Sequence, residues 1–148
     1  MDYDYIIAGG GSSGCVTAWR LVKDHGARVL LLEAGPPDKS MLFRMPAGFF
    51  KMLGGSPYLN IYESEPQARL NGRTTKVPQA NVLGGGSSVN AMIYMRGKPE
   101  EYDEWDVASG GAGWTWRHML PHYTRLEGNQ RHVMPLHGDD GPLKASDH

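Results

Sequence analysis

Two glycine-rich stretches contain the residues of this chain that are best suited to holding phosphate groups. Residues 9 to 14 have the spacing Gly-x-Gly-x-x-Gly, and residues 84 to 88 are three glycines followed by two serines. In the first spacing, one glycine allows a tight turn, the next lets the backbone approach a pyrophosphate, and the third lets a helix pack closely on a strand. Backbone N–H groups of the second stretch can converge on an oxygen-rich ligand. Both stretches favour nucleotide binding.

The first glycine-rich stretch lies between segments that are patterned as a strand and a helix. Residues 3 to 8 predict a short buried strand, and residues 13 to 25 predict a helix that Gly26 terminates. Residues 28 to 32 predict a second buried parallel strand beside the first. This order of strand, turn, helix and strand is the context that a dinucleotide-binding glycine motif requires.

Glu33 ends the second predicted strand, about twenty residues beyond the glycines. A carboxylate at this position accepts hydrogen bonds from ribose hydroxyls and disfavours a 2′-phosphate, which favours FAD or NAD over NADP. We expect the change Glu33→Gln to weaken cofactor binding and to leave the phosphate loop intact. The alternative reading is a glycine turn with a solvated acid at the end of a strand.

The segment from about residue 36 to residue 80 lacks the alternation of strand and helix. It is dense in proline, glycine and aromatic residues, and long segments of this kind are typically lids or covers. Its apolar content argues against disorder. We therefore expect an excursion that packs partly against the cofactor, through Phe43, Met45, Phe49, Phe50, Met52 and Leu53.

Composition narrows the class of partner. The chain of 148 residues carries 15 basic and 16 acidic side chains, which gives no electrostatic case for nucleic acid or an anionic membrane. No run of eighteen apolar residues and no charged-then-apolar leader is present, so we expect no membrane span and a cytoplasmic location. The single cysteine, Cys15, excludes an internal disulfide, and packing on the sheet is its expected role.

The middle of the chain resembles the first signature of the glucose/methanol/choline (GMC) oxidoreductases, which are FAD-dependent alcohol oxidases and dehydrogenases. Further matches run from about residue 3 to about residue 147. The residues that carry the signature are Leu83-Gly84-Gly85-Gly86-Ser87, Val89-Asn90, Tyr94, Gly97 and Asp103, and the other matches include Leu31-Leu32-Glu33-Ala34-Gly35, Met92-Ile93-Tyr94-Met95-Arg96-Gly97 and Gly113-Trp114-Thr115-Trp116.

The resemblance implies an α/β fold, namely a Rossmann-like FAD-binding domain with a parallel sheet that is incomplete at its C-terminal end. Residues 1 to 148 would form the N-terminal FAD-binding region, and residues 140 to 148 would start the substrate-domain segment. The implied cofactor-binding residues are Gly9, Gly11 and Gly14 in the phosphate loop, Ser12, Ser13, Glu33 and Ala34 around the ADP half of FAD, and Val82, Gly86, Asn90, Ala91 and Ile93 from the pyrophosphate to the isoalloxazine.

Two positions in the second stretch refine this expectation. Some family members tether the flavin through a histidine at the position of Val89, so the resemblance implies a non-covalent FAD. The side chain of Asn90 offers an acceptor and two donors to a heteroaromatic ring edge. The other reading of this stretch is a tight turn, with Asn90 capping a buried segment over residues 89 to 95.

None of the six histidines lies where the family carries its catalytic base, which we expect C-terminal to His148. His118 and His122 are four residues apart on a predicted helix, but no third ligand accompanies them, and we expect no metal site. His132, His137 and His148 are interpreted as loop or surface residues.

The aromatic residues around the glycine-rich loop 109 to 113 allow two interpretations. Tyr102, Trp105, Trp114 and Trp116 could form a wall against substrate, although anchoring of the loop to the core is the favoured role. Residues 117 to 126 predict a short amphipathic helix that is broken near Pro121.

Two functional hypotheses follow. The chain is either the N-terminal portion of an FAD-dependent oxidoreductase that passes hydride from a primary alcohol to flavin N5, or a non-catalytic FAD-binding fragment of such an enzyme. An NAD-dependent dehydrogenase is a distant third, because the second glycine-rich stretch has no role there. The expected partner is a small-molecule alcohol, and the oligomeric state is left open.

Overall fold

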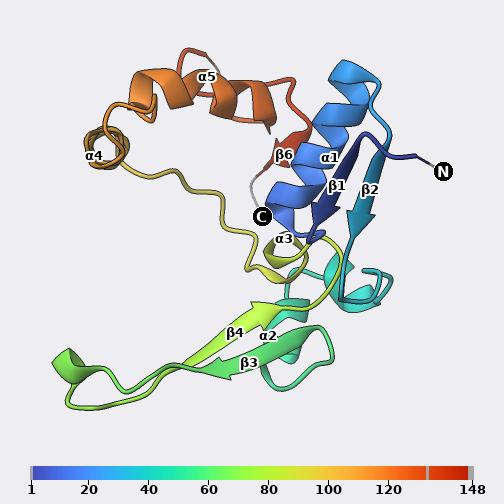
Figure 1. Cartoon of the computed structure of the whole chain (residues 1–148), viewed down its shortest axis with the longest axis vertical. Helices are drawn as coiled ribbons and strands as arrows, with labels where there is room; N and C mark the ends of the chain where they lie inside the picture. The colour runs from blue at the N-terminus through green and yellow to red at the C-terminus, as the bar shows by residue number, and fades with distance from the viewer. Residues whose placement is uncertain (1, 133, 147–148) are drawn as a thin grey trace. The chain divides into compact units, whose positions relative to one another are not determined.

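The computed structural model describes residues 2–132 and 134–146, and the chain divides into two compact units, residues 1–93 and 94–148. Figure 1 follows the chain from blue at its N-terminus to red at its C-terminus. Both units combine helices with small two-stranded sheets, and two of these sheets are parallel. The α/β class predicted from the sequence is therefore confirmed.

The first unit begins with the predicted strand, helix and strand. Strand β1 (Tyr5–Ala8) pairs in parallel with β2 (Val29–Leu32), and helix α1 (Ser12–His25) joins them. Gly26 ends α1 in the left-handed conformation, and its N–H donates to the carbonyls of Leu21 and Val22. The period of the apolar residues and the position of this glycine were sufficient to predict these three elements.

The excursion over residues 36 to 80 is more regular than the sequence indicated. It contains the 3-10 turn η1 (Met41–Arg44), the short helix α2 (Gly48–Leu53), and an antiparallel hairpin of β3 (Leu59–Glu63) and β4 (Lys76–Ala80). Figure 1 shows the hairpin in green, and a second 3-10 turn, η2 (Ala68–Leu70), lies near its tip. The sequence pattern did not predict this hairpin.

The tip of this hairpin explains why the strands pair. Asn71 and Gly72 both have positive φ, at 56° and 72°, and the N–H of Arg73 donates to the carbonyl of Leu70 across them. An Asn-Gly pair with this backbone conformation forms the turn that matches the twist of two antiparallel strands. Pro78 lies within β4 opposite Ile61, which is compatible with a strand at the edge of a sheet.

The second unit consists of two helices and a small parallel sheet. Its elements are α4 (Pro99–Ala108), α5 (Trp116–Leu126), β5 (Glu127–Asn129) and β6 (Leu143–Ala145), with Glu127 opposite Leu143 in the sheet. Helix α5 continues through Pro121, so the predicted break there is wrong. The hydroxyl of its Thr115 N-cap accepts from His118 N–H, and the amphipathic face of the helix compensates for the missing proline donor.

Tyr102 is the buried centre of the second unit, with only 3% of its surface exposed. Its ring packs against those of Trp105, Trp116 and Tyr123 at centroid distances of 5.2 to 5.9 Å. Its hydroxyl accepts from Gly97 N–H at 3.2 Å and lies 2.8 Å from the Tyr123 hydroxyl. Burial, together with this hydroxyl contact, raises the pKa of Tyr123 to about 12, so Tyr123 is a neutral phenol at neutral pH.

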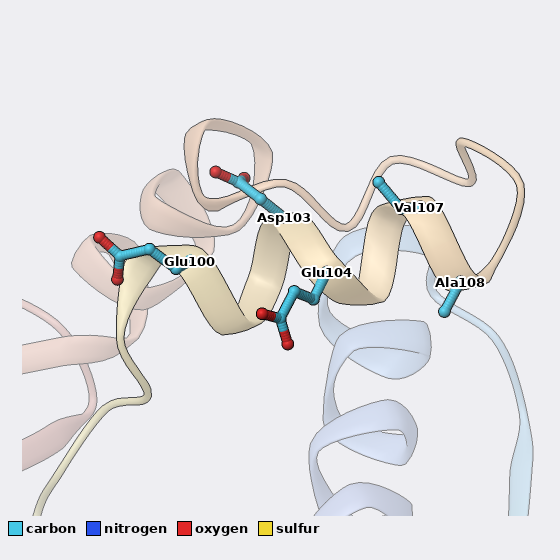
Figure 2. Close-up of a pocket in the computed structure, with 5 residues that line it drawn as sticks. All are labelled: Glu100, Asp103, Glu104, Val107 and Ala108. Atoms are coloured by element: carbon cyan, nitrogen blue, oxygen red, sulfur yellow. The ribbon is translucent and has the colours of Figure 1, made fainter.

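One face of α4 lines a shallow groove of about 440 Å³ (Figure 2). Glu100, Asp103, Glu104, Val107 and Ala108 line this groove, and Figure 2 shows the three carboxylates pointing in different directions. Within residues 2–132 and 134–146, no group of three potential ligands is arranged to hold a metal ion. No helix in the same ranges is long and apolar enough to cross a membrane.

The hydroxyl of Tyr102 gives a first test of the second unit. The change Tyr102→Phe removes the partner of two polar groups, Gly97 N–H and the Tyr123 hydroxyl, and should lower the free energy of unfolding by about 1–3 kcal/mol. Urea unfolding followed by tryptophan fluorescence measures this loss. The matched control is Tyr62→Phe in β3, where the ring is 57% exposed and the loss should be below about 0.5 kcal/mol. Equal losses in the two variants would contradict a stabilising role for the hydroxyl contacts.

Candidate cofactor site

The N-terminus of α1 is arranged to receive an anion. Its N-cap is Gly11 in an extended conformation, with no capping side chain and no acidic residue in the first turn. The first backbone bond of the helix runs from Cys15 N–H to Gly11 C=O, so the N–H groups of Ser12, Ser13 and Gly14 have no partner within the helix. Several free donors at the positive end of a helix dipole favour binding of a phosphate.

Gly14 allows α1 to lie against the end of β1. A Cβ atom at this position would fall 1.9 Å from the carbonyl oxygen of Gly9 and 3.4 Å from Ile7 Cγ2. No side chain fits there without moving the backbone. The close packing of helix and strand that the sequence predicted for the third glycine of the motif is therefore present.

Glu33 lies directly after β2 and holds the glycine loop in place. Its carboxylate accepts from Gly10 N–H at 2.5 Å and from Gly35 N–H at 2.8 Å. The bond from Gly35, followed by the bond from Gly10, keeps the pKa of Glu33 below its ordinary value, so the side chain is charged at neutral pH. The expectation that Glu33→Gln leaves the phosphate loop intact is wrong, because this carboxylate is one of the supports of that loop.

The second glycine-rich stretch lies against the first. The N–H of Gly84 donates to the carbonyl of Gly10 at 2.7 Å, and the hydroxyls of Ser12 and Ser87 are in hydrogen-bond contact. Gly85 has a φ of 56°, and a Cβ atom there would fall 2.6 Å from Gly11 Cα. The two stretches therefore lie together, and glycine is needed where the two backbones meet.

The residues next to these loops divide into a buried and an accessible group. Val82 is 1% exposed, and the backbone of residues 81 and 82 lies against Gly35, where a Cβ atom would fall 2.3 Å from it. Ala34 is exposed, and Gly86 is exposed with open space where its Cβ atom would lie. The buried Val82 therefore supports the loop, while the exposed Gly86 is accessible to a ligand.

The short helix α3 (Gly86–Val89) ends at Asn90, whose side chain bonds to the backbone two residues further on. Its Oδ1 accepts from Met92 N–H at 2.9 Å, and its amide nitrogen is free to donate. Ala91 is exposed, as are Ile93 at 77% and Met95 at 84%. The capping role considered for Asn90 is therefore observed, but the buried segment it was expected to cap is not.

The excursion covers the side of α3. A cavity of about 50 Å³ lies between the two, and its lining from the excursion is Leu42, Phe43, Met45, Phe49 and Met52, while Ser87, Ser88, Asn90 and Met92 line the other side. Met52 is buried at 2% exposure, whereas Phe50 and Leu53 are more than half exposed. The predicted packing of this segment is therefore present beside the second glycine-rich stretch.

Gly10 helps to build this site but was not singled out from the sequence. It is buried, both its N–H and its C=O are bonded, and a Cβ atom there would fall 2.8 Å from Leu83 Cδ1. The thiol of Cys15 donates to the Gly10 carbonyl at 3.2 Å, which gives this cysteine a more local role than packing on the sheet. The Gly-x-Gly-x-x-Gly motif assigns roles to Gly9 and Gly11 but none to Gly10, which lies between them.

The histidines of the second unit have structural contacts. His118 Nδ1 lies 3.0 Å from the hydroxyl of Thr115, and His122 is exposed on the same helix. His132 is exposed in a loop, and His137 also lies in a loop, as expected, but it is partly buried with its Nδ1 2.9 Å from the carboxylate of Glu127. His148 lies outside the described residues.

Known proteins resemble this chain along almost its whole length. Residues 3–148 match the model of the GMC oxidoreductase family. The chain is 47% identical over 147 residues to an alcohol dehydrogenase [acceptor] of Pseudomonas putida, covering 98% of this chain and 26% of that protein. It spans about a quarter of the length of the curated relatives it matches.

Solved structures agree with this result. The crystal structure of pyridoxine 4-oxidase from Mesorbium loti is 37% identical with a TM-score of 0.87, covering 97% of this chain and 28% of that one. An FAD-dependent oxidoreductase from Chaetomium thermophilum is 38% identical with a TM-score of 0.80, covering 97% of this chain and 26% of that one. With its two joined glycine loops and the family match along almost its whole length, this chain belongs to the GMC oxidoreductase family.

Proposed function

We propose that this chain binds FAD non-covalently in a Rossmann-like domain and is the N-terminal part of an oxidoreductase acting on primary alcohols. The observation that carries the proposal is the bond from Gly84 N–H to the Gly10 carbonyl, which joins two phosphate-type loops beside the uncapped end of α1. FAD-dependent and alcohol-oxidising proteins among its relatives support the same choice. NAD-dependent dehydrogenases need only the first loop.

The residues present fit the two halves of FAD. Free N–H groups of Ser12, Ser13 and Gly14 face the place of the pyrophosphate, with Gly9 and Gly11 leaving the backbone open there. Glu33, with Ala34 beside it, still has a lone pair for the ribose hydroxyls, because a carboxylate has about four acceptor sites and the backbone N–H groups of Gly10, Gly35 and Ala34 occupy at most three. We assign Val82 and Gly86 to the part of the site next to the pyrophosphate. Asn90, Ala91 and Ile93, which follow in the chain, are assigned to the flavin half.

The chemistry divides between the cofactor and residues outside this chain. When bound, FAD supplies an electron-accepting ring that takes a hydride at N5 from the alcohol carbon, while a base takes the hydroxyl proton. The free amide nitrogen of Asn90 offers a donor to the edge of that ring. We place the base C-terminal to residue 148, where the resemblance to the family puts it in relatives about four times as long as this chain.

Glu33 provides the first test of the cofactor site. In the variant Glu33→Gln, FAD affinity should fall by about 1.5–3 kcal/mol, because a charge-assisted bond to ribose is lost and the Gln amide faces a backbone donor. Titration calorimetry on the purified protein stripped of flavin measures the affinity. Glu65→Gln, an exposed change on the hairpin, is the control and should leave FAD affinity unchanged.

A pair of competitors separates the ribose contact from the support of the loop. Wild-type protein should bind ADP more tightly than 2′-deoxy-ADP, and Glu33→Gln should abolish that difference. If the variant weakens both nucleotides equally, Glu33 acts on the loop alone and the ribose assignment is wrong.

The mode of flavin attachment is tested by acid precipitation of the flavin-loaded protein. Val89 occupies the position that carries the tethering histidine in some relatives, so we expect the flavin to appear as intact FAD in the supernatant. Chromatography with fluorescence detection identifies it. A yellow pellet that retains flavin after denaturation would contradict non-covalent binding.

The proposal that the base lies outside this chain is tested on the 148-residue chain alone. Loaded with FAD and mixed anaerobically with benzyl alcohol, choline and pyridoxine, it should not reduce the flavin measurably. The missing base contributes a factor of about 10² to 10⁴, and the missing substrate positioning adds to it. Bleaching of the flavin absorbance at a rate near that of a full-length relative would overturn this assignment and direct the search for a base to the histidines of this chain.

A further inference from the structure

Two histidines of the second unit lie in one loop that is closed at its base. Asn129 N–H donates to the carbonyl of Gly138 at 2.8 Å, at the point where β5 ends. Between these two residues the chain carries His132 and His137. The centres of their rings lie 5.2 Å apart, with an angle of 37° between the ring planes. The closed loop therefore brings two imidazoles side by side.

Glu127, the first residue of β5, holds one of these rings. Its carboxylate is fully buried, with 0% of the residue exposed, and its two oxygens lie 2.9 Å and 3.1 Å from His137 Nδ1. Asn129 Nδ2 donates to the same carboxylate at 2.7 Å, and the guanidinium of Arg96 pairs with it. A buried carboxylate is tolerated when opposite charge and hydrogen bonds surround it in this way.

The ionisation of Glu127 decides which nitrogen of His137 can bind a ligand. Burial raises the pKa of the Glu127 carboxyl, but the bonds from Asn129 and His137 and the charge of Arg96 outweigh burial, so the pKa lies below its ordinary value. An ionised carboxylate can only accept, so we assign the hydrogen of this bond to His137 Nδ1. In the neutral ring the lone pair is then on Nε2, the nitrogen that does not face Glu127.

The same buried group also positions His132. Asn129 donates to Glu127 through its amide nitrogen, and its Oδ1 accepts from the N–H groups of Arg131 and His132, both at 2.8 Å. The backbone of His132 is thereby fixed, while the residue as a whole is exposed. One network thus holds both histidines, and the ring of His132 is accessible to a ligand.

This arrangement has the features of a histidine metal site. Histidines that bind a metal almost always donate their other N–H group to a carboxylate, a carbonyl or water, which fixes the ring and its tautomer. His137 makes such a bond to Glu127. Zinc binds imidazole nitrogen at about 2.0–2.1 Å, so two imidazoles on one tetrahedral ion have ring centres about 5 Å apart. The 5.2 Å between the rings of His132 and His137 agrees with that spacing.

We propose that His132 and His137 bind one Zn²⁺ ion, with Glu127 as the carboxylate that orients His137. The described residues contain no group of three metal-binding side chains, so we assign the remaining positions of the ion to water. An ion shared by both rings restrains the loop between Asn129 and Gly138, which is a structural role for the metal. The site is independent of FAD and of the proposed function.

Zinc affinity is measured on the full-length protein without an affinity tag, by competition with a chromophoric chelator. His132→Ala should weaken zinc binding by at least about tenfold, because one of two protein ligands is lost. Excess Mg²⁺ should not displace the zinc, because Mg²⁺ prefers oxygen ligands. The matched control is His122→Ala, which removes an exposed histidine of α5 and should retain wild-type affinity.

The role of the carboxylate is tested by the variant Glu127→Gln. An amide can donate to His137 or accept from it but carries no charge, so zinc affinity should fall by about 10- to 100-fold. A second measurement needs no variant and remains decisive if Glu127→Gln fails to fold. In crystals of the wild-type protein soaked in zinc, the anomalous peak should lie about 2.0–2.1 Å from His137 Nε2 and from a ring nitrogen of His132.

The results that contradict the proposal are specific to the pair. Wild-type affinity in His132→Ala, an equal loss in the His122→Ala control, or an anomalous peak that contacts only one of the two histidines would overturn the site. Wild-type affinity in a folded Glu127→Gln protein would refute the orienting role of the carboxylate.

Discussion

The backbone of Gly10 is the junction on which the first unit depends. Its N–H is held by the Glu33 carboxylate, and its carbonyl accepts from Gly84 N–H and from the Cys15 thiol. One residue thereby joins the end of β2, the second glycine-rich stretch and the first turn of α1. The shape of this glycine loop therefore depends on bonds from residues far away in the sequence as well as on its own glycines.

Local patterns of the sequence predicted the elements that local chemistry determines. The apolar runs, the Gly-x-Gly-x-x-Gly spacing and Gly26 were sufficient for β1, α1 and β2. The hairpin was missed because the search weighed composition over the Asn71-Gly72 pair, which is itself a strong local turn signal. The break predicted at Pro121 failed because packing of the helix outweighed an intrinsic preference.

The remaining errors concern contacts that no local pattern contains. Glu33 was correctly placed at the end of β2, but its bond to Gly10 spans 23 residues and is set by the fold. The burial of Glu127 was not predicted, because charged side chains are rarely buried unless they are paired. Its partner, Arg96, is 31 residues away in the chain. Such pairs become visible only when distant segments are brought together.

Each sheet in the described part of the chain has two strands, so every one of these strands is an edge strand. Ile6 in β1 and Leu32 in β2 are at least half exposed, although parallel strands are normally covered on both faces. In a relative about four times as long, synthesis of the rest of the chain takes about tens of seconds at roughly 5–20 residues per second. Open edges and apolar faces of this kind, exposed during that time, are prone to aggregation.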